Sequence, residues 1–218
     1  MTWHREVLPA GWQGVAADLA SRGVTARAYL AGGTAVALWL GHRRSADLDL
    51  FTQAAFDASA MRDRLVGLDG LRHVELAEAT LYFELRGIKV SLITYPYPLL
   101  FPATDLDGLP VADPRDLGCM KVDAIAARGA RRDFIDLHAL LDGYALPSLL
   151  EWFTTKYAQA SFNRAHVLKA LTYFDDAERE PEPDMLAPIR WDDVRGRFLR
   201  EVPALARLTH GTESDDGG

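Results

Sequence analysis

The chain has 218 residues, of which 49% are hydrophobic and 25% charged, and its formal net charge is -7. This composition excludes a disordered or fibrous chain, and the acidic balance argues against a protein that coats nucleic acid through bulk charge. A single cysteine, Cys119, excludes an intramolecular disulfide and a cysteine-rich metal site. Because the sequence has neither a bilayer-length apolar run nor a signal-like start, we expect a cytoplasmic protein.

The first half of the chain predicts alternating helices and strands. Apolar spacing predicts a helix over 11–22 that ends at Gly23, followed by a buried strand over 26–31. The next expected elements are a helix over 34–40, a strand over 47–52, a helix over 56–66 and strands over 71–78, 81–86 and 88–95. This order predicts an α/β (α+β) fold with a mixed sheet of about five strands flanked by helices.

The second half predicts helices. Asp113 is a favourable N-cap and Pro114 a favourable first residue for a helix that continues to about Arg128. Further helices are expected over 130–143, 147–159, 163–174 and 191–208. We therefore expect an α/β core over 1–112, a helical region over 113–210 that closes one side of a cleft, and a flexible tail over 211–218.

Two carboxylates stand two residues apart in Asp47-Leu48-Asp49-Leu50. In a strand, side chains alternate between faces, so both aspartates are expected on one face and both leucines on the other. Such a pair is costly unless water, a basic group or a hard cation neutralises it, and Mg²⁺ binds one or two carboxylates together with substrate phosphates. Taken alone, two solvated surface acids are the simpler interpretation.

A diglycine precedes the aspartate pair. Gly32 and Gly33 would let phosphates approach the backbone closely, and helix-start N–H groups from Thr34 onward would face them. The joint pattern favours a metal and nucleotide site. In that site Asp47 and Asp49 hold Mg²⁺ or Mn²⁺, which orients the α-phosphorus for in-line attack by an acceptor hydroxyl while pyrophosphate leaves.

A basic turn lies between the diglycine and the aspartates. Arg43, Arg44 and Ser45 are candidates to add charge or a hydrogen bond near the leaving group. Arginines in a turn are also commonly solvated without further function, which is the alternative interpretation.

Lys121 and Arg128 interrupt an otherwise apolar face of the helix that begins after Asp113. Either both stems lie over the rim of the core, or Lys121 reaches the triphosphate while Arg128 supports the acceptor or an acidic partner.

Asp133 and Asp136 follow on the next helix. They either complement the helix dipole, or fix the lysine or accept a proton from the acceptor hydroxyl.

The segment GGTAVALWLGHRRSADLDLF resembles a known signature. Gly-Gly-Thr, a spacer and Asp-x-Asp are similar to the motif of the polymerase-beta nucleotidyltransferase superfamily, and the full segment resembles its AbiEii/AbiGii toxin branch. The run MKVDAIAARGARRDFIDLHALL resembles the second signature of that branch, and LKALTYFDDAEREPEPDML resembles the closing segment of its short members. The likeness therefore extends over nearly the whole chain.

The resemblance implies that Lys121 binds the nucleotide and that Asp136 belongs to the site. It also implies Mg²⁺-dependent transfer of a nucleotide from an NTP to tRNA or protein, by a toxin that a cognate antitoxin opposes. One position departs from the superfamily pattern: Ser91 stands where a third carboxylate is usual, which leaves the site one negative charge short. Glu84 is an alternative acid, although an outward-facing strand residue is its simpler interpretation.

Two other functions stay open from the sequence. A catalytically weak or inactive nucleotidyltransferase-like protein would bind NTP or a partner without turnover, and Ser91 favours this alternative. A small-molecule modifier, such as an aminoglycoside-type nucleotidyltransferase, would need an open and acidic acceptor pocket, with which the acidic net charge is consistent.

Overall fold

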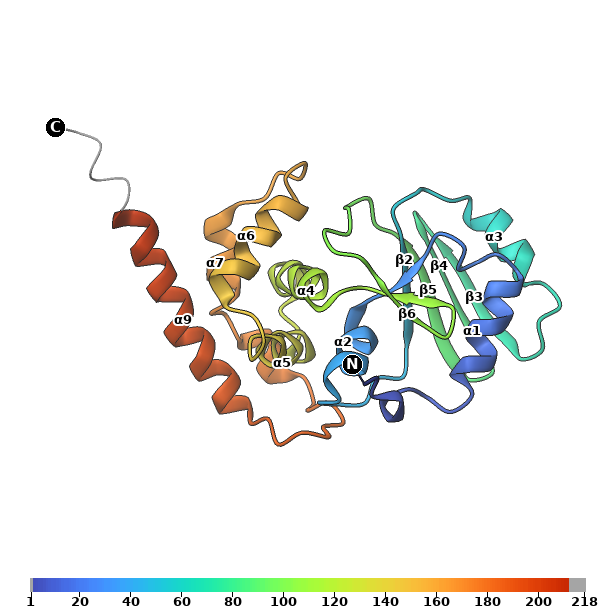
Figure 1. Cartoon of the computed structure of the whole chain (residues 1–218), viewed down its shortest axis with the longest axis horizontal. Coiled ribbons are helices and arrows are strands. Elements are labelled where there is room, and N and C mark those ends of the chain that lie inside the picture. The colour runs from blue at the N-terminus through green and yellow to red at the C-terminus, as the bar shows by residue number, and fades with distance from the viewer. Residues whose placement is uncertain (1, 212–218) are drawn as a thin grey trace. The chain divides into compact units, whose positions relative to one another are not determined.

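The computed structural model describes residues 2–211, and the side chains of residues 2–205 (Figure 1). It divides into two compact units, Met1–Leu117 and Gly118–Gly218, which are described separately. Residues 212–218 of the predicted tail lie outside the described residues, whereas Gly211 is the last residue of a helix. Within residues 2–211, no helix combines the length and the apolar composition that crossing a membrane requires.

A mixed sheet of seven strands forms the centre of the first unit. The strands are β1 (Tyr29–Leu30), β2 (Leu48–Thr52), β3 (Leu71–Ala77), β4 (Thr80–Leu85), β5 (Ile88–Thr94), β6 (Thr104–Leu106) and β7 (Leu109–Val111). They lie in the order β3-β4-β5-β2-β1-β7-β6, with β2 parallel to β5 and antiparallel to β1. The expected mixed α/β architecture is confirmed, but the expected size of about five strands is wrong.

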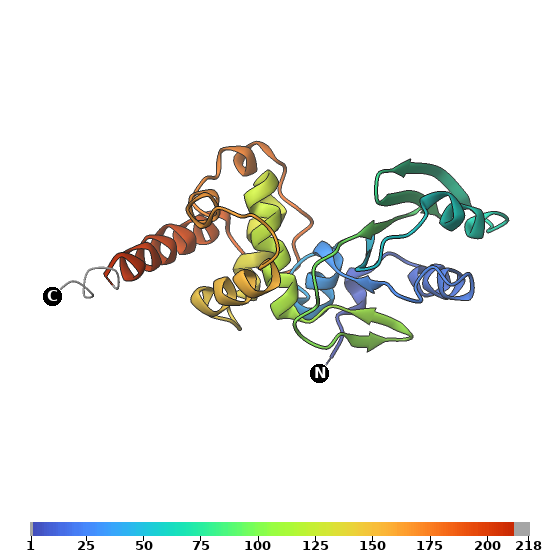
Figure 2. The same cartoon turned by 90° about the horizontal axis from the view of Figure 1, so that it is seen from above.

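Helices α1 (Trp12–Ser21) and α3 (Ala58–Leu65) lie on the same side of the sheet, as Figures 1 and 2 show. Leu50 of β2 is 1% exposed and pairs with Leu92 of β5. Leu92 in turn lines a cavity together with Met61 of α3. The apolar residues of β2 therefore face the helices, as the alternation in the sequence predicts.

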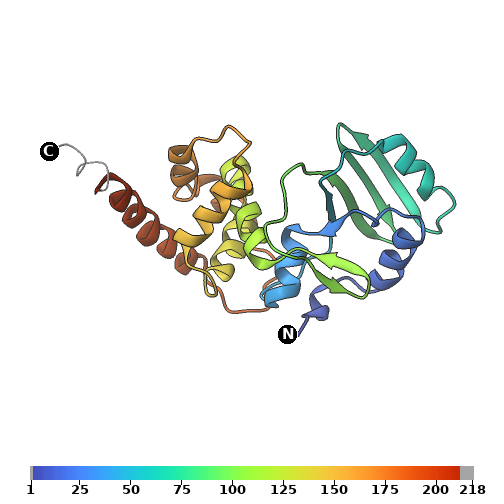
Figure 3. The ribbon, with the colours of Figure 1, turned by 45° about the horizontal axis from the view of Figure 1, so that its top comes forward.

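The hairpin of β6 and β7 accounts for the difference in strand number (Figure 3). Its turn is Asp107-Gly108, whose φ angles of 52° and 86° match the left-handed conformation of a two-residue hairpin turn. Each strand has three residues, and Pro110 lies in β7. Strands this short carry no readable period-two pattern, and a proline argues against a strand.

A left-handed glycine ends α2, and a side-chain cap begins α3. This unit also contains the 3₁₀ helix η1 (Arg5–Val7). Gly41, with φ 65°, ends α2 (Gly32–Leu40), and its N–H donates to the Ala37 carbonyl at 2.7 Å. Asp57 caps α3, because its Oδ1 accepts hydrogen bonds from two N–H groups of the first turn, at 2.8 and 3.1 Å. The end of α2 agrees with the predicted helix over 34–40, but α2 begins two residues earlier, and α3 is shorter than the predicted helix over 56–66.

The second unit is helical, as expected. Its helices are α4 (Pro114–Arg128, beginning in the first unit), α5 (Arg131–Leu140), α6 (Leu146–Lys156), α7 (Arg164–Ala170), α8 (Asp175–Arg179) and α9 (Trp191–Gly211). The Sγ of Cys119 on α4 lies 3.9 Å from the Leu149 carbonyl of α6, which leaves this cysteine buried and inert. The single helix expected over 163–174 is in fact shorter, and α8 follows it as a separate turn of helix.

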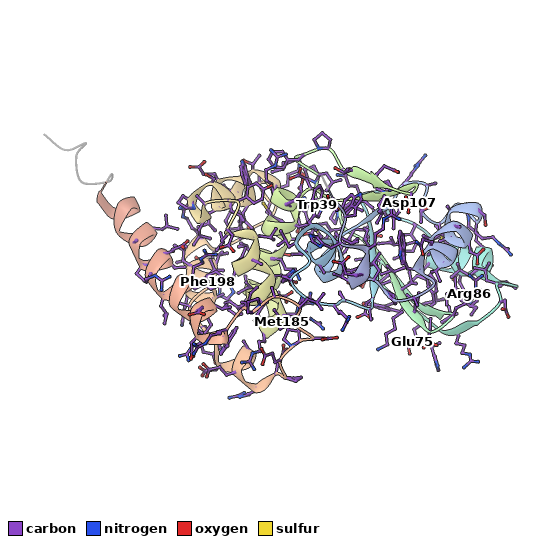
Figure 4. All side chains as sticks on the ribbon, turned by 60° about the horizontal axis from the view of Figure 1, so that its bottom comes forward. Trp39, Glu75, Arg86, Asp107, Met185 and Phe198 are labelled. Carbon is purple, nitrogen blue, oxygen red and sulfur yellow. The ribbon has the colours of Figure 1, made fainter. Side chains whose placement is uncertain are left out.

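Aromatic rings hold α5, α8 and α9 together. The ring of Phe134 on α5 lies 5.1 Å from Phe174, 6.0 Å from Trp191 and 5.5 Å from Phe198, measured between centroids. Figure 4 shows Phe198 on the side of α9 that faces the other helices of this unit. Each such pair contributes about 0.5–1.5 kcal/mol beyond the apolar area that it buries.

Candidate functional site

Asp49 lies on the face of the sheet opposite the buried leucines of β2. It is half-buried, whereas Leu48 and Leu50 are each 1% exposed. In the parallel register of β2 and β5, Asp49 pairs with Ser91. The Ser91 hydroxyl donates a hydrogen bond of 2.5 Å to Asp49 Oδ1. Ser91, which stands in the expected position of a third acid, therefore orients the carboxylate instead of adding a charge.

Gly32 lies directly against the Asp49 carboxylate. A Cβ at Gly32 would lie 2.8 Å from Asp49 Oδ2, which is closer than real Cβ contacts come, and the φ of Gly32 is +67°. The Ala31 N–H also donates to the Asp49 carbonyl at 3.0 Å. The first glycine of the predicted diglycine is therefore required by its conformation and by its close approach to Asp49.

Asp47 is exposed and is the residue before β2, so the strand begins one residue later than predicted. The buried hydroxyl of Thr34 hydrogen-bonds to the Asp47 carbonyl. Its Oγ1 also lies 2.7 Å from Ser45 Oγ. Thr34 thus ties the basic turn and the start of β2 to the first turn of α2.

The diglycine opens α2. Gly32, Gly33 and Thr34 are its first three residues, and Ala31, in an extended conformation, precedes them without a side-chain cap. The N–H groups of a first helical turn have no partner within the helix. This arrangement is suited to the approach of an anion from the solvent side, as the sequence predicts for phosphates.

The two arginines of the basic turn differ in environment. Arg43 is 4% exposed, and its Nη1 donates to the Arg44 carbonyl at 3.0 Å. Arg44 is exposed. Simple solvation therefore does not describe Arg43, whose side chain is part of the turn itself.

Asp47, just before β2, and Asp49, in β2, are the carboxylates that could hold a hard cation. Asp47 and Asp49 supply carboxylate oxygens, which Mg²⁺ prefers, and the cation completes its shell with water and phosphate oxygens. Among residues 2–205, no group of three or more His, Cys, Asp or Glu side chains is arranged to hold a metal ion.

In the second unit, Lys121 is held between two carboxylates. Its Nζ lies 2.7 Å from Asp133 Oδ1 and 2.7 Å from Asp136 Oδ2, and all three side chains are at most 5% exposed. Arg128 adds a second contact to Asp133, with Nε 2.8 Å from Oδ2. The lysine predicted for the site is therefore a buried and paired cation, and both acids of the next helix contact it.

The charge state of Asp133 depends on this cluster. Burial by itself would raise the pKa of its carboxyl, but the charge of Lys121 and the hydrogen bond from Arg128 lower the pKa overall. Of the two interpretations of Arg128 in the sequence, the contact with an acidic partner is the one that its geometry supports.

The polar face of the sheet also carries an aromatic residue that belongs to no sequence motif. Tyr82 of β4 pairs with Ser91 and is 45% exposed. In the register of β4 and β5, Glu84, the alternative third acid, lies opposite Lys89. The alternation in TLYFEL and IKVSLIT contains this signal, because it assigns Tyr82 and Ser91 to one face once the two strands are paired.

Comparisons with known proteins concern the family and the fold. The family model described as Nucleotidyl transferase AbiEii toxin, Type IV TA system, matches residues 16–78 and 83–213. An uncharacterised protein of Aquifex aeolicus (strain VF5) is 38% identical over 188 residues, which is 84% of this chain and 89% of that protein. The match of the family model confirms the resemblance found in the sequence.

A solved structure supports the fold. MenT4, a nucleotidyltransferase toxin of Mycobacterium tuberculosis H37Rv, is similar with a TM-score of 0.52 and 16% identity, over 85% of this chain and 82% of that one. At this identity the likeness concerns the fold alone. With the match of the family model along its length, the chain belongs to the AbiEii nucleotidyltransferase toxin family.

Proposed function

We propose that this chain transfers a nucleotide from an NTP to a macromolecular acceptor, tRNA or protein, with Mg²⁺ or Mn²⁺ as cofactor. The observation that supports the proposal most strongly is the close approach of the Asp49 carboxylate to Gly32 at the first turn of α2. A carboxylate beside helix-start N–H groups suits a triphosphate that carries a cation. Membership of the family supports the same class of reaction.

Each residue of this segment has a role in the proposal. Asp47 and Asp49 would hold the cation, which neutralises the phosphates and the departing pyrophosphate when it is bound. Gly32 and Gly33 would admit the phosphates to the backbone, because neither has a side chain. Thr34 would keep the loop in place through its hydrogen bond to the Asp47 carbonyl.

The basic turn has a supporting role in the proposal. Arg44 is the exposed arginine, and we assign it the contact with the phosphates of the substrate. Arg43 and Ser45 would shape the turn, in agreement with the hydrogen bond of Arg43 to the Arg44 carbonyl and the contact between Ser45 and Thr34.

Lys121 and Asp136 are proposed to serve the same reaction. The lysine would supply positive charge to the nucleotide, and Asp136 would accept the proton of the acceptor hydroxyl. The ion pair of 2.7 Å between them supports a shared role, because it holds both side chains in one cluster. Asp133 and Arg128 would keep the lysine in position.

A binding protein without turnover is the second candidate. The observation that favours it is Ser91, a neutral hydroxyl where the superfamily usually has an acid. Such a protein would bind the NTP with one cation but would not activate the acceptor.

A separate antitoxin is the proposed protein partner in both cases. The description of the matching family includes a toxin–antitoxin system, which supports a partner of this kind for this chain.

The experiment that tests the proposal is label transfer. Purified chain is incubated with each of four α-labelled NTPs and Mg²⁺ or Mn²⁺, with total tRNA or with a protein extract as acceptor, beside an Asp47→Asn variant. Label in one acceptor class, lost in the variant, is the expected result. Binding of Mg-NTP without label in either acceptor would favour the binding protein and contradict the proposal.

A further inference from the structure

The first unit contains a cavity of about 330 Å³ on the side of the sheet that α3 covers. It is lined by Thr52 at the end of β2, by Leu92 of β5, by Met61 of α3 and by residues of the segment 23–28. Thr52 and Asp49 are three residues apart in β2, so they lie on opposite faces of the sheet. The sheet therefore separates this cavity from the carboxylate proposed to hold the catalytic cation.

The interior of the cavity is apolar. Val24, Ala28 and Leu92 are at most 5% exposed and form its most buried part. Phe56 and Met61 add a ring and a flexible thioether chain. Apolar surface of a ligand that enters such a space leaves water, which is favourable. The interior therefore suits the hydrocarbon part of a ligand.

Two arginines supply the charge of the lining. Arg27 and Arg64 both line the cavity and are both exposed, and the lining residues include no Asp or Glu. Among residues 2–205, no carboxylate forms an ion pair with either guanidinium. The two positive charges therefore favour an anionic group at the cavity.

The acids that adjoin the lining residues in the sequence have other partners. Asp57, which follows Phe56, accepts hydrogen bonds from two N–H groups at the start of α3, at 2.8 and 3.1 Å. Asp63, which precedes Arg64, lies 2.8 Å from Nη2 of Arg62. These contacts direct both carboxylates to groups other than the two arginines of the lining.

Backbone contacts hold Arg64 at the cavity. Its Nη1 lies 3.5 Å from the carbonyls of Arg22 and Gly23, and Arg22 Nη1 in return donates to the Arg64 carbonyl at 3.2 Å. A Cβ at residue 23 would lie 2.9 Å from Arg64 Nη1, so the glycine admits the guanidinium. A guanidinium has five N–H donors. Because these contacts use only Nη1, Nε and Nη2 are left to bind an anion.

The cavity is poorly suited to a nucleobase. Apart from the two arginines, Thr52 is the only described lining residue whose side chain forms hydrogen bonds. Its hydroxyl lies 3.4 Å from the Ala54 carbonyl, to which it donates. The lining therefore offers an apolar surface and two cations, but few groups that could pair with the polar edge of a base.

We propose that this cavity binds an amphiphilic anion, a small molecule with an apolar chain and a carboxylate or phosphate head. The head lies between Arg27 and Arg64, because guanidinium groups bind the oxygens of carboxylates and phosphates in pairs. The chain packs against Phe56, Met61 and Leu92. This site is separate from the proposed transfer reaction and does not depend on it.

Met61 offers a direct probe of the site. The chain has four methionines, and Met61 is the one among the described lining residues. The full chain, with isotope-labelled methionine methyl groups, is titrated with octanoate, octyl phosphate, 1-octanol and acetate and followed by NMR. Octanoate or octyl phosphate should shift the Met61 signal, assigned with Met61→Leu, until it saturates, and the tighter of the two identifies the head. Acetate, which lacks the chain, should bind more than about a hundredfold more weakly, and 1-octanol, which lacks the charge, about tenfold more weakly.

Arg27→Gln tests the contact with the head. Arg72→Gln is the matched control, because Arg72 is an exposed arginine of β3 that is not among the described lining residues. Arg27→Gln is expected to weaken binding of the tighter anion about tenfold, and Arg72→Gln less than about twofold. Both substitutions change exposed side chains, and circular dichroism checks that both variants are folded.

Four results would overturn the proposal. The first is the absence of a saturable shift of the Met61 signal with either long-chain anion. The second is equal affinity for 1-octanol and the tighter anion, because the arginines would then have no part in binding. The third is equal affinity for acetate and octanoate, because the apolar interior would then have none. The fourth is equal affinity in folded Arg27→Gln and Arg72→Gln.

Discussion

The Ser91 hydroxyl donates to Asp49 Oδ1 at 2.5 Å across two adjacent parallel strands. This contact fixes one oxygen of the carboxylate and leaves Oδ2 beside Gly32. A hydroxyl at this position removes the repulsion that a second acid would cause in the absence of a cation. Because residue 91 is a neutral serine, the proposed metal site has one negative charge fewer than a site with a third acid.

Replacing Ser91 by aspartate should couple stability to the cation. Without divalent metal, two neighbouring carboxylates repel, and we expect the free energy of unfolding to fall by about 1–3 kcal/mol. Mn²⁺ or Mg²⁺ should restore the thermal midpoint of Ser91→Asp more than that of the wild type. Ser91→Ala, which loses only a hydrogen bond, is the control. If the metal raises the midpoints of Ser91→Asp and Ser91→Ala by equal amounts, the cation does not bind at this end of the sheet.

Gly32→Ala should impair both stability and transfer. The φ of +67° costs an alanine about 1–2 kcal/mol, and its Cβ would lie 2.8 Å from Asp49 Oδ2. Displacement of the carboxylate by even about 1 Å is expected to reduce the transfer rate by on the order of 10²-fold. Gly67→Ala is the matched control, because Gly67 has φ +85° with nothing within 4 Å of its added Cβ. Gly67→Ala should lose a similar amount of unfolding free energy through its backbone and should retain the transfer rate. Equal rates in the two variants would show that the contact with Asp49 is not needed.

Lys121→Met should be strongly destabilising. The change leaves Asp133 and Asp136 buried without their shared cation, which is expected to cost about 3–5 kcal/mol in urea unfolding. Adding Asp136→Asn should recover part of this loss, because it removes a buried negative charge that has lost its lysine. Additive losses in the double variant would contradict a coupled cluster. Lys121→Arg, which retains the charge, is the better variant for testing transfer.

The stability that Asp133 contributes should depend on pH in one direction. Its pKa in the folded chain is lowered from the ordinary value of 3.8, despite burial, by Lys121 and Arg128. A lowered folded pKa gives stability that is present above the unfolded pKa and lost as the pH falls through the folded pKa. At pH 7, the free energy of unfolding measured in urea should be larger for the wild type than for Asp133→Asn. This difference should shrink below about pH 4. A difference that is the same at pH 7 and pH 3 would exclude this account.

The longer elements of the chain could be predicted because their patterns are local. Alternation over Leu48–Thr52, the Asp57 cap of α3 and the left-handed Gly41 each follow from a few neighbouring residues. The hairpin of β6 and β7 could not, because three-residue strands that contain a proline are formed by pairing in the folded sheet.

The sequence could nominate candidate site residues, but it could not give their contacts. The spacing of Gly32 and Asp49 indicated a joint motif, yet their direct contact depends on how α2 and β2 meet. The sequence left the role of Asp133 open between the helix dipole and Lys121, because the side chains meet only when α4 packs on α5.

The measurement that tests the central claim most directly is the initial rate of label transfer, from the best α-labelled NTP to its acceptor, in the wild type, Asp49→Asn and Asp69→Asn. Asp69 is an exposed acid of the same unit and serves as the matched control. The account predicts a loss on the order of 10³-fold in Asp49→Asn and less than about twofold in Asp69→Asn, with both proteins folded. Transfer by Asp49→Asn at the wild-type rate would contradict the claim that this carboxylate holds the catalytic cation.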